Sequence, residues 1–484
     1  MTGDARYEEI PYPGLPLVQT HPDRLAMLGR LFGLPTADPA TARVLEVGCG
    51  DGANLIPMAY GLPDATFTGI DASPSAIARA REQAAALGLD NVRFEEVSLA
   101  DHAPEHGGVD YVIAHGVYSW VPAPLREALL ALCTRALARH GVAYVSYNTY
   151  PGGRLRQVLR EILAVELEGI EDPAQRLAAT REKLATLRAA WTYDEGLATL
   201  GGLATSLIEA SDALLYHDTL APANTPLYFR DFVAAAHTAG LQFLAEAEFW
   251  EMQVGWLPHD VRPSLLESAD RLQREQRLDF MRMRTFRQTL LCHASCVLEE
   301  VTPQRLADLA AAAPITASAA PGGAGVTFSG RRGQALTSEH PVVIAALQRL
   351  AEAWPAALPT ASLWSPDAGP QERLVVCETL LRCFSADLVT LHCAPIAVGT
   401  GAAERPRASA IARLQARDGA TLTNLRHEVV ELDEHGRLRV ALLDGSRDRA
   451  AVRAGLAAAG AHDDPAVLQQ SIEQLARHAL LVAE

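Results

Sequence analysis

The chain is poor in positive charge, in aromatic residues and in long apolar runs. Its 484 residues include 42 Lys and Arg against 58 Asp and Glu, which gives a net charge of −16 at pH 7, and only 6% are aromatic. Binding to a polyphosphate backbone depends on clustered Lys and Arg, so this balance argues against nucleic acid as a partner. No run of about 18 apolar residues occurs, and the first residues lack the basic and apolar segments of a signal peptide. We therefore expect a cytoplasmic protein without membrane insertion.

Disulfides and metals are not expected either. The seven cysteines are an odd number scattered through apolar segments, which is typical of reduced core thiols. Cys292 and Cys296 come nearest to a metal-binding pattern, but no second Cys or His pair follows at zinc spacing. The composition, 49% apolar and 21% charged, is that of an ordered protein. A chain of this length is expected to form about two to four domains.

The first part of the chain alternates short apolar strands with helical segments. Strands are expected at 42–47, 66–70, 92–96, 111–114 and 142–147, and helices at 22–32, 53–60, 74–87 and 124–139. This alternation predicts an α/β fold with a Rossmann-like, doubly wound and mostly parallel sheet. Strand character returns at 241–247 and 285–293. The strandless segment before it, about 154–220, is interpreted as a helical insertion into the sheet domain.

The main domain boundary is expected near residue 300. It separates a sheet domain, 1–300, from a smaller C-terminal α+β domain, 301–484. In the second domain, helices are expected at 303–313, 341–353, 371–384 and 405–417, and a strand at 437–443. The Gly-rich segment 319–325 is either a turn between two short strands or a flexible link. The charged runs 246–248 and 282–284 are interpreted as solvated faces.

The strongest local signal is a buried strand that opens through glycines into a helix, Val44-Leu45-Glu46-Val47-Gly48-Cys49-Gly50-Asp51-Gly52. Glycines there let the backbone approach a ligand closely, and the free amides of a helix N-terminus attract a negative group. Gly48, Gly50 and Ala53 also satisfy the dinucleotide fingerprint, with Asp71 at the expected distance downstream. That fingerprint alone would permit NAD.

The pattern Glu-x-Gly-x-Gly-x-Gly resembles motif I of the class I S-adenosylmethionine-dependent methyltransferases, which favours S-adenosylmethionine over NAD as the cofactor. The resemblance implies that the glycine turn lies under the methionyl part of the cofactor and that Asp71 binds both ribose hydroxyls, a task that suits a carboxylate. Ser98 stands where an Asp often holds the adenine amine, with Leu99 or Asp101 as substitutes. The implied cofactor-binding set is Glu46, Gly48, Cys49, Gly50, Gly52, Asn54, Asp71, Ala72, Ser98, Leu99, His115 and Gly116.

Motifs further along the chain narrow this resemblance. They are His115-Gly116-Val117-Tyr118-Ser119-Trp120, Ser146-Tyr147-Asn148-Thr149-Tyr150, Tyr216-His217 and Phe286-Arg287-Gln288-Thr289-Leu290-Leu291-Cys292-His293. Together they look like the bacterial methyltransferases that carry a methyltransferase regulatory domain. The best-understood members of that family methylate lysines of outer-membrane proteins and have a winged-helix-like C-terminal region, which residues 442–449 resemble. The resemblance therefore implies N-methylation of protein lysines.

Candidates for the acceptor side follow the ends of the strands, where an open α/β sheet places its ligands. His115 and Asn148 follow the fourth and fifth strands. Tyr150 is favoured over Tyr147, which still belongs to the strand. Tyr118 either lines a channel for a cationic substrate or packs the loop.

Two further candidates lie outside the strand ends. Tyr12, with Tyr7, precedes the first helix and either folds over the cofactor as a lid or packs as an arm. His217 follows the helical insertion and either reaches the pocket or packs in the core. The candidate catalytic set is thus Tyr12, His115, Tyr118, Asn148, Tyr150 and His217.

Three functions stay open. A protein lysine methyltransferase predicts an open acidic groove between the two domains. A small-molecule or natural-product methyltransferase predicts a closed pocket under the helical insertion. A non-catalytic regulatory module would keep the fold and use 301–484 for partner contacts. The first is favoured, with a protein or peptide as partner, and a homodimer is left open.

Overall fold

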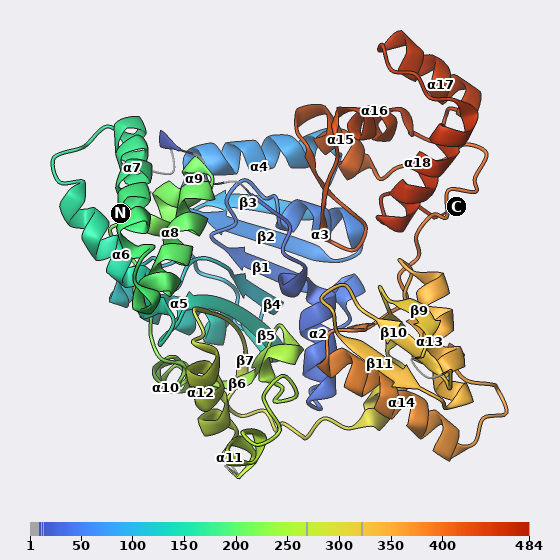
Figure 1. Ribbon diagram of the computed structural model, residues 1–484, viewed down its shortest axis with the longest axis horizontal. Coiled ribbons are helices and arrows are strands. Elements are labelled where there is room, and N and C mark those ends of the chain that lie inside the picture. The colour runs from blue at the N-terminus through green and yellow to red at the C-terminus, as the bar shows by residue number, and fades with distance from the viewer. Residues whose placement is uncertain (1–8, 11, 13, 268–269, 321–322, 484) are drawn as a thin grey trace.

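The sheet at the centre of the molecule has seven strands in the order β3-β2-β1-β4-β5-β7-β6 (Figure 1). The structure is a computed structural model that describes residues 9–483 except 11, 13, 268–269 and 321–322. Neighbouring strands are parallel from β3 to β5, whereas β7 is antiparallel to β5 and β6. The bounds are β1 (Arg43–Val47), β2 (Thr66–Asp71), β3 (Val92–Glu96), β4 (Val109–Ala114), β5 (Leu137–Asn148), β6 (Leu241–Glu246) and β7 (Phe286–His293). The expected doubly wound sheet is confirmed.

Helices cover both faces of this sheet because its strands are apolar on both sides. In β4, Tyr111 and Ile113 face one core, while Val112 and Ala114 face the other. A near-continuous apolar run of this kind is what a strand buried on both faces requires. The first core lies under α2 (Pro22–Leu31), α3 (Leu55–Gly61) and α4 (Pro74–Ala86), and the second under α5 (Ala123–Ala136) and α10 (Phe229–Thr238).

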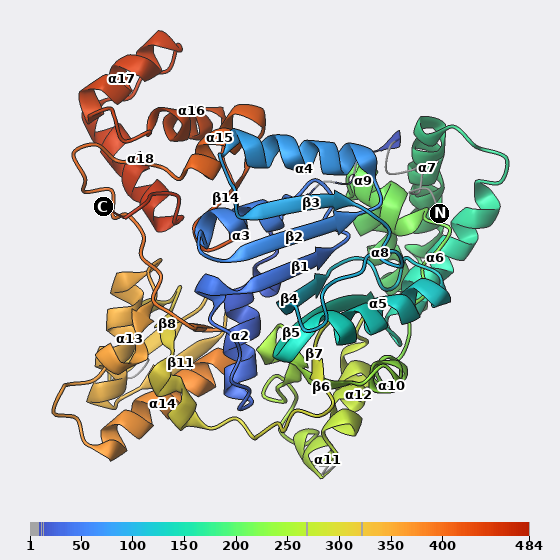
Figure 2. The ribbon, with the colours of Figure 1, turned by 180° about the vertical axis from the view of Figure 1, so that it is seen from behind.

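A helical layer lies at the carboxyl edge of the sheet. The arrowheads of β1 to β3 point toward it in Figure 1, and the reverse view in Figure 2 agrees. It consists of α6 (Gly153–Glu166), α7 (Pro173–Trp191), α8 (Ala198–Glu209), α9 (Asp212–Leu214) and the π-helical turn η4 (Leu215–Thr219). These helices share a core of their own around Leu159, Leu184 and Leu215. No helix in the described part of the chain is long and apolar enough to span a membrane.

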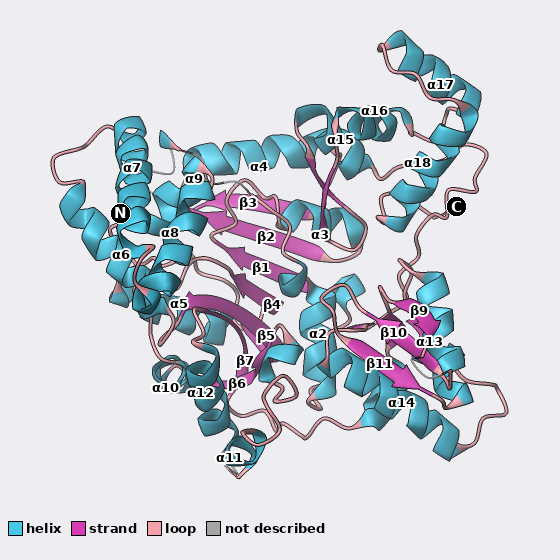
Figure 3. Cartoon of the chain, viewed as in Figure 1, coloured by secondary structure: helices cyan, strands magenta, loops and turns pink. Residues whose placement is uncertain are grey.

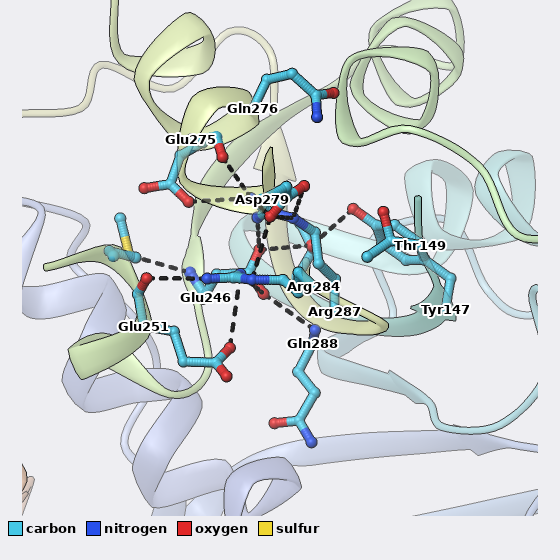
Figure 4. A network of polar contacts seen from close by, with 12 residues as sticks. Tyr147, Thr149, Glu246, Glu251, Glu275, Gln276, Asp279, Arg284, Arg287 and Gln288 are labelled. Carbon is cyan, nitrogen blue, oxygen red and sulfur yellow. Dashed lines mark hydrogen bonds and ion pairs between the residues drawn. The ribbon is translucent and has the colours of Figure 1, made fainter. Parts of the chain in front are cut away.

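Beyond β6, the chain makes η5 (Phe249–Met252), α11 (Arg262–Leu266) and α12 (Arg271–Arg282) before it returns as β7. Arg287 of β7 is fully buried there, and its guanidinium donates to Glu246 Oε1 at 2.6 Å, Asp279 Oδ1 at 2.8 Å and Glu275 Oε2 at 3.3 Å (Figure 4). Arg284, with only 4% of its side chain exposed, pairs with Asp279 at 3.1 Å. The interpretation of 246–248 and 282–284 as solvated faces is wrong for Glu246 and Arg284, because each charge is buried against partners from another element.

Two small sheets follow the large one and pack with α13 (Pro341–Ala353) and α14 (Pro370–Ser385) (Figure 3). Their strands are β8 (Ala310–Ala312), β9 (Thr316–Ala319), β10 (Val326–Ser329), β11 (Ala335–Ser338), β12 (Leu358–Pro359) and β13 (Thr390–His392). β9 and β10 pair antiparallel, with Ala319 opposite Val326, so the two short strands expected on either side of the Gly-rich segment are confirmed. The helix expected at 303–313 is wrong beyond Asp308, where the 3₁₀ helix η6 (Pro303–Asp308) ends, because Ala310–Ala312 pairs with both β12 and β13.

The last part of the chain forms a helical unit with a two-stranded hairpin. Its elements are α15 (Ala410–Asp418), β14 (Thr421–Thr423), β15 (Val429–Glu431), α16 (Glu434–Leu442), α17 (Arg449–Ala458) and α18 (Pro465–Arg477). The strand expected at 437–443 is wrong, since α16 occupies that segment. Asp433 caps this helix by accepting a hydrogen bond from Gly436 N at 2.7 Å, and Arg439 pairs with Asp463 at 2.8 Å.

Candidate functional site

The glycine loop after β1 is closely packed at two positions and open at the third. Gly48, Gly50 and Gly52 all have positive φ, of 73°, 53° and 78°, a conformation that favours glycine. A Cβ at Gly48 would lie 2.8 Å from Val117, and one at Gly52 would lie 2.9 Å from Phe94. No heavy atom of the described residues lies within 4 Å of a Cβ at Gly50. The loop therefore presents its bare backbone to free space at Gly50.

Gly116 is a second open backbone position, after the strand next to β1. It follows β4, the neighbour of β1, has a φ of 67°, and its Cβ position is equally open. Its N–H donates to Ser146 Oγ at 2.8 Å, which ties the loop to β5. Gly50 and Gly116 thus follow adjacent strands at the carboxyl edge of the sheet, and these two open backbone positions are called the cradle below.

A carboxylate stands beside the cradle at the end of β2. Asp71 accepts a hydrogen bond from Gly50 N on Oδ2 and another from Ser73 N on Oδ1, each at 2.9 Å. Ala72 is exposed next to it. Ser98 and Leu99 are half-buried after β3, the strand that pairs with β2. The predicted ribose and adenine residues therefore lie along one edge.

Three predicted cofactor residues have their side chains buried below the loop. The Cys49 thiol packs toward Gly69, and burial raises its pKa. Glu46 is 4% exposed, its Oε1 accepts a hydrogen bond from Asn54 Nδ2 at 2.7 Å, and its Oε2 has no hydrogen-bond partner among the described residues. Burial, with the charges of Asp71 and Asp51, raises the pKa of Glu46 to about 8.

The Asn54 amide is engaged on both of its ends, which corrects the expectation that it contacts the cofactor. Its Oδ1 accepts from Leu17 N and lies 2.9 Å from His427 Nε2, while its Nδ2 donates to Glu46 and to Thr20 Oγ1. All four hydrogen-bonding positions of the amide are taken within the protein. Asn54 supports the loop instead of facing a ligand.

His115 turns its ring onto β5 and β7. Its Nδ1 lies 2.9 Å from the Tyr144 hydroxyl, its ring stacks on Tyr144, and it meets the edge of Phe286 with ring centroids 5.9 Å apart. Burial lowers the pKa of His115 to about 4, so the imidazole is neutral at pH 7.

A cavity of about 320 Å³ lies at the start of β7, and Phe286 forms part of its wall. Glu248, Glu251, Arg284 and Gln288 also line it. Burial raises the pKa of Glu251 to about 7. Because β7 runs antiparallel to β5, its first residues lie at the carboxyl edge of the parallel strands, and this cavity adjoins His115 there.

Asn148 and Tyr150 extend this edge beyond β5. The Asn148 amide donates to Asn224 Oδ1 at 3.0 Å, and the Tyr150 hydroxyl donates to Gln157 Oε1 at 3.0 Å. The Arg154 guanidinium lies 4.0 Å from the centroid of the Tyr150 ring. Sequence reasoning missed Asn224 and Gln157. Asn224 had a weak signal, as a polar residue between two prolines, whereas Gln157 lies in an ordinary helical stretch.

Of the two alternatives for Tyr118, the structure supports packing over a place in a substrate channel. Tyr118 is 4% exposed and packs against Phe232 and Tyr147, with ring centroids 5.1 and 6.1 Å away. Its ring completes the core under α5 and α10.

The lead segment joins the helical layer to the glycine loop. His217 is buried in η4 and donates from Nε2 to the Ile10 carbonyl at 2.6 Å, and the Tyr12 ring meets it edge-on at 5.6 Å. Gly14 lies so close to Asp51 that a Cβ there would overlap the carboxylate. Tyr12 and His217 thus belong to a cover over the loop, whereas His115, Asn148 and Tyr150 belong to the sheet edge. Tyr7 lies outside the described residues.

Three segments of the chain match known domain families. Residues 44–141 match a methyltransferase domain, residues 211–293 a predicted methyltransferase regulatory domain, and residues 404–481 the C-terminal winged helix domain of PKMT. The glycine loop and Asp71 lie in the first segment, His217 and Arg287 in the second, and His427 in the third.

Among curated relatives, an uncharacterised protein of Rickettsia prowazekii is 36% identical over 292 residues, which are 59% of this chain and 52% of that protein. The chain thus spans about half the length of this relative. A trans-aconitate 2-methyltransferase of Variovorax paradoxus is 28% identical over 246 residues, 50% of this chain and 79% of that enzyme.

A solved structure matches over almost the whole chain. PKMT2 from Rickettsia typhi, in complex with AdoHcy, has a TM-score of 0.87 at 24% identity and covers 98% of this chain and 100% of its own. At this identity, the likeness establishes a shared fold.

Proposed function

We propose that the chain is a class I S-adenosylmethionine-dependent methyltransferase and that it methylates lysine side chains of a protein substrate. The match of residues 44–141 to a methyltransferase domain supports the activity. The observation that carries the proposal is the open backbone at Gly50 and Gly116, with Asp71 hydrogen-bonded to Gly50. A cavity lies further along the same sheet edge, and glutamates and arginines both line it. One edge of the sheet thus offers a cofactor side and an acceptor side.

S-adenosylmethionine is the cofactor, and it supplies an electrophilic methyl group on a sulfonium when bound. The cradle suits it because a Cβ at Gly50 or Gly116 would fill the free space. Each oxygen of Asp71 accepts one backbone N–H, which leaves further lone pairs on both for the two ribose hydroxyls. Ser98 and Leu99 follow the next strand and are proposed to border the adenine.

The acceptor side suits an amine. An alkylammonium must lose its proton before it can attack a methyl group, and a partly apolar site promotes that loss by disfavouring the charged form. Glu251 has a pKa of about 7, so near neutrality it can hold an ammonium as a carboxylate or take up its proton. Phe286 supplies an aromatic wall, and His115 packs against the Phe286 ring. Holding the amine in line with the methyl group supplies most of the rate enhancement.

The net charge of −16 favours a cationic substrate over an anionic one. The match of 404–481 to the winged helix domain of PKMT supports a protein acceptor. A small-molecule acceptor is the second candidate, because the lead segment covers the glycine loop and the relatives include a trans-aconitate 2-methyltransferase.

Transfer of labelled methyl from S-adenosylmethionine into a bacterial lysate tests the proposal, with protein and small molecules separated afterwards. We expect Asp71-dependent label in protein that survives base treatment and hydrolyses to methyl-lysine. Label confined to small molecules would select the second candidate. Label in neither fraction would contradict both.

A further inference from the structure

The turn between β14 and β15 brings a histidine of the winged helix domain under the glycine loop. In Figures 1 and 2 this hairpin reaches from the C-terminal unit to α3. His427, in the turn, is 4% exposed, and its Nε2 lies 2.9 Å from Asn54 Oδ1, 373 residues away in sequence.

The backbone of this turn is held in a fixed shape. Asn424 Oδ1 accepts from Arg426 N at 2.8 Å and from Glu428 N at 2.9 Å, and the Arg426 guanidinium donates to the Pro355 carbonyl at 3.0 Å. His427 has a φ of 61°, in the left-handed region that favours glycine. A bulky imidazole at a strained and buried position indicates that its contact with Asn54 matters.

The neighbours of Asn54 fix the direction of each hydrogen bond. Because Leu17 N donates to Oδ1 at 2.9 Å, the amide oxygen must face the lead segment and His427. The amide nitrogen then donates to Glu46 at 2.7 Å and to Thr20 at 3.0 Å. It follows that His427 Nε2 carries the proton and donates it to Asn54.

One amide therefore joins four parts of the chain: β1 through Glu46, the start of α3, the lead segment through Leu17 and Thr20, and the winged helix domain through His427. Glu46 lies two residues before Gly48, and Asn54 lies two residues after Gly52. The glycine loop is thus clamped at both ends by residues that meet through this amide.

We propose that His427 is a positioning residue for the cofactor site, which it sets by holding Asn54 and, through Asn54, Glu46 and the lead segment over the glycine loop. The winged helix domain is then part of the cofactor-binding structure and does more than recruit substrate. The inference rests on the proposed function insofar as the site binds S-adenosylmethionine.

The same interface offers a matched control. Tyr60 of α3 accepts a hydrogen bond from Ala410 N on its hydroxyl at 3.0 Å, so it also joins the methyltransferase domain to the C-terminal unit. The hydrogen bonds of Asn54 do not include Tyr60. Tyr60→Phe therefore weakens domain docking without touching the amide that holds the loop.

The experiment compares the full chain with His427→Ala, His427→Gln and Tyr60→Phe. Titration calorimetry gives the Kd for S-adenosylmethionine, and hydrogen exchange reports on the amides of residues 14–20 and 48–56. We expect His427→Ala to raise the Kd by at least about tenfold and to speed exchange in both segments. His427→Gln, which keeps an N–H donor, should restore most of the affinity. Tyr60→Phe should leave the Kd within about twofold.

An unchanged Kd and unchanged loop exchange in His427→Ala would overturn the inference. So would an equal loss in Tyr60→Phe, which would reduce the role of His427 to general docking. If the unmodified chain fails to bind S-adenosylmethionine, the proposed function fails, and the exchange of residues 14–20 and 48–56 still decides whether His427 holds the loop.

Discussion

Two buried polar clusters in this molecule differ in charge and in how far apart their residues lie in the sequence. The cluster around Arg287 is charged, lies within residues 246–289, and surrounds one guanidinium with the carboxylates of Glu246, Glu275 and Asp279. The cluster around Asn54 is centred on a neutral amide, which meets His427 from 373 residues away in sequence. It includes a Glu46 oxygen with no hydrogen-bond partner among the described residues.

The difference separates a cluster that holds the fold from one that serves the site. Arg287 links β6 and β7 to α12, and its guanidinium also lies 3.9 Å from the ring of Phe229 in α10. All of these partners lie within residues 229–287. The Asn54 cluster includes residues just before and just after the glycine loop and joins four parts of the chain. Breaking the first cluster should therefore affect stability most, and breaking the second should affect cofactor binding as well.

The largest expected effect comes from Arg287→Met. This change removes the cation and leaves Glu246 and Asp279 buried without it, which should lower the free energy of unfolding by about 3–5 kcal/mol. Urea denaturation measures the loss. The control, Arg93→Met, removes an exposed partner of Glu95 and should cost less than about 1 kcal/mol. Equal stability of the two variants would contradict the structural role of the Arg287 cluster.

Asn54→Ala should come next. It leaves Leu17 N, Glu46 and His427 without their common partner, and we expect a loss of about 2–3 kcal/mol together with weaker binding of S-adenosylmethionine. Because His427 acts through Asn54, adding His427→Ala to Asn54→Ala should change the Kd little further. Additive losses in this double-mutant cycle would show that the two residues act separately.

A smaller effect on stability, but a distinct one on binding, is expected for Gly50→Ala. Gly50 and Gly88 both have positive φ and an open Cβ position, but only Gly50 borders the cradle. Each alanine should cost about 1 kcal/mol in strain. Calorimetry should show weaker cofactor binding for Gly50→Ala alone. The same Kd in both variants would place the cofactor elsewhere.

The last effect appears only as the pH changes, and it comes from Glu46. Its pKa is about 8 in the fold against 4.5 for an unburied glutamate, so between these values the folded state keeps a proton that the unfolded state has lost. Stability from this group is full below about pH 4.5 and is lost as the pH rises to about 8. In Glu46→Gln, the free energy of unfolding should therefore decrease less with rising pH, by roughly 1–3 kcal/mol. Urea unfolding at pH 5 and pH 8 measures this change. The same pH dependence of stability in the unmodified chain and in Glu46→Gln would contradict the burial of a protonated Glu46.

The sheet and the cofactor edge could be predicted because their signals are local. Buried strands such as Val109–Ala114 are visible as apolar runs. The glycine loop after Glu46 can be recognised from the nine residues 44–52 alone. The segment 437–443 is predicted wrongly because its alternating basic and apolar residues suit either a short strand or an amphipathic helix. The N-cap at Asp433 favours the helix.

The rest could not be predicted because it depends on contacts between distant segments. Glu246 and Arg284 look solvated in sequence, since only the fold brings Arg287 and Asp279 to them. Tyr118 has the same local surroundings whether it lines a site or packs against Phe232. Nothing in the sequence around His427 indicates its role, because its partner Asn54 lies in another domain.

The most direct test of the account is calorimetric binding of S-adenosylmethionine to the full chain and to Asp71→Ala, with circular dichroism to show that both are folded. The account predicts that the unmodified chain binds and that Asp71→Ala loses affinity by at least about tenfold, because its carboxylate accepts hydrogen bonds beside the cradle. Equal affinity in both proteins, or no binding to the unmodified chain, would contradict the assignment of this edge as the cofactor site.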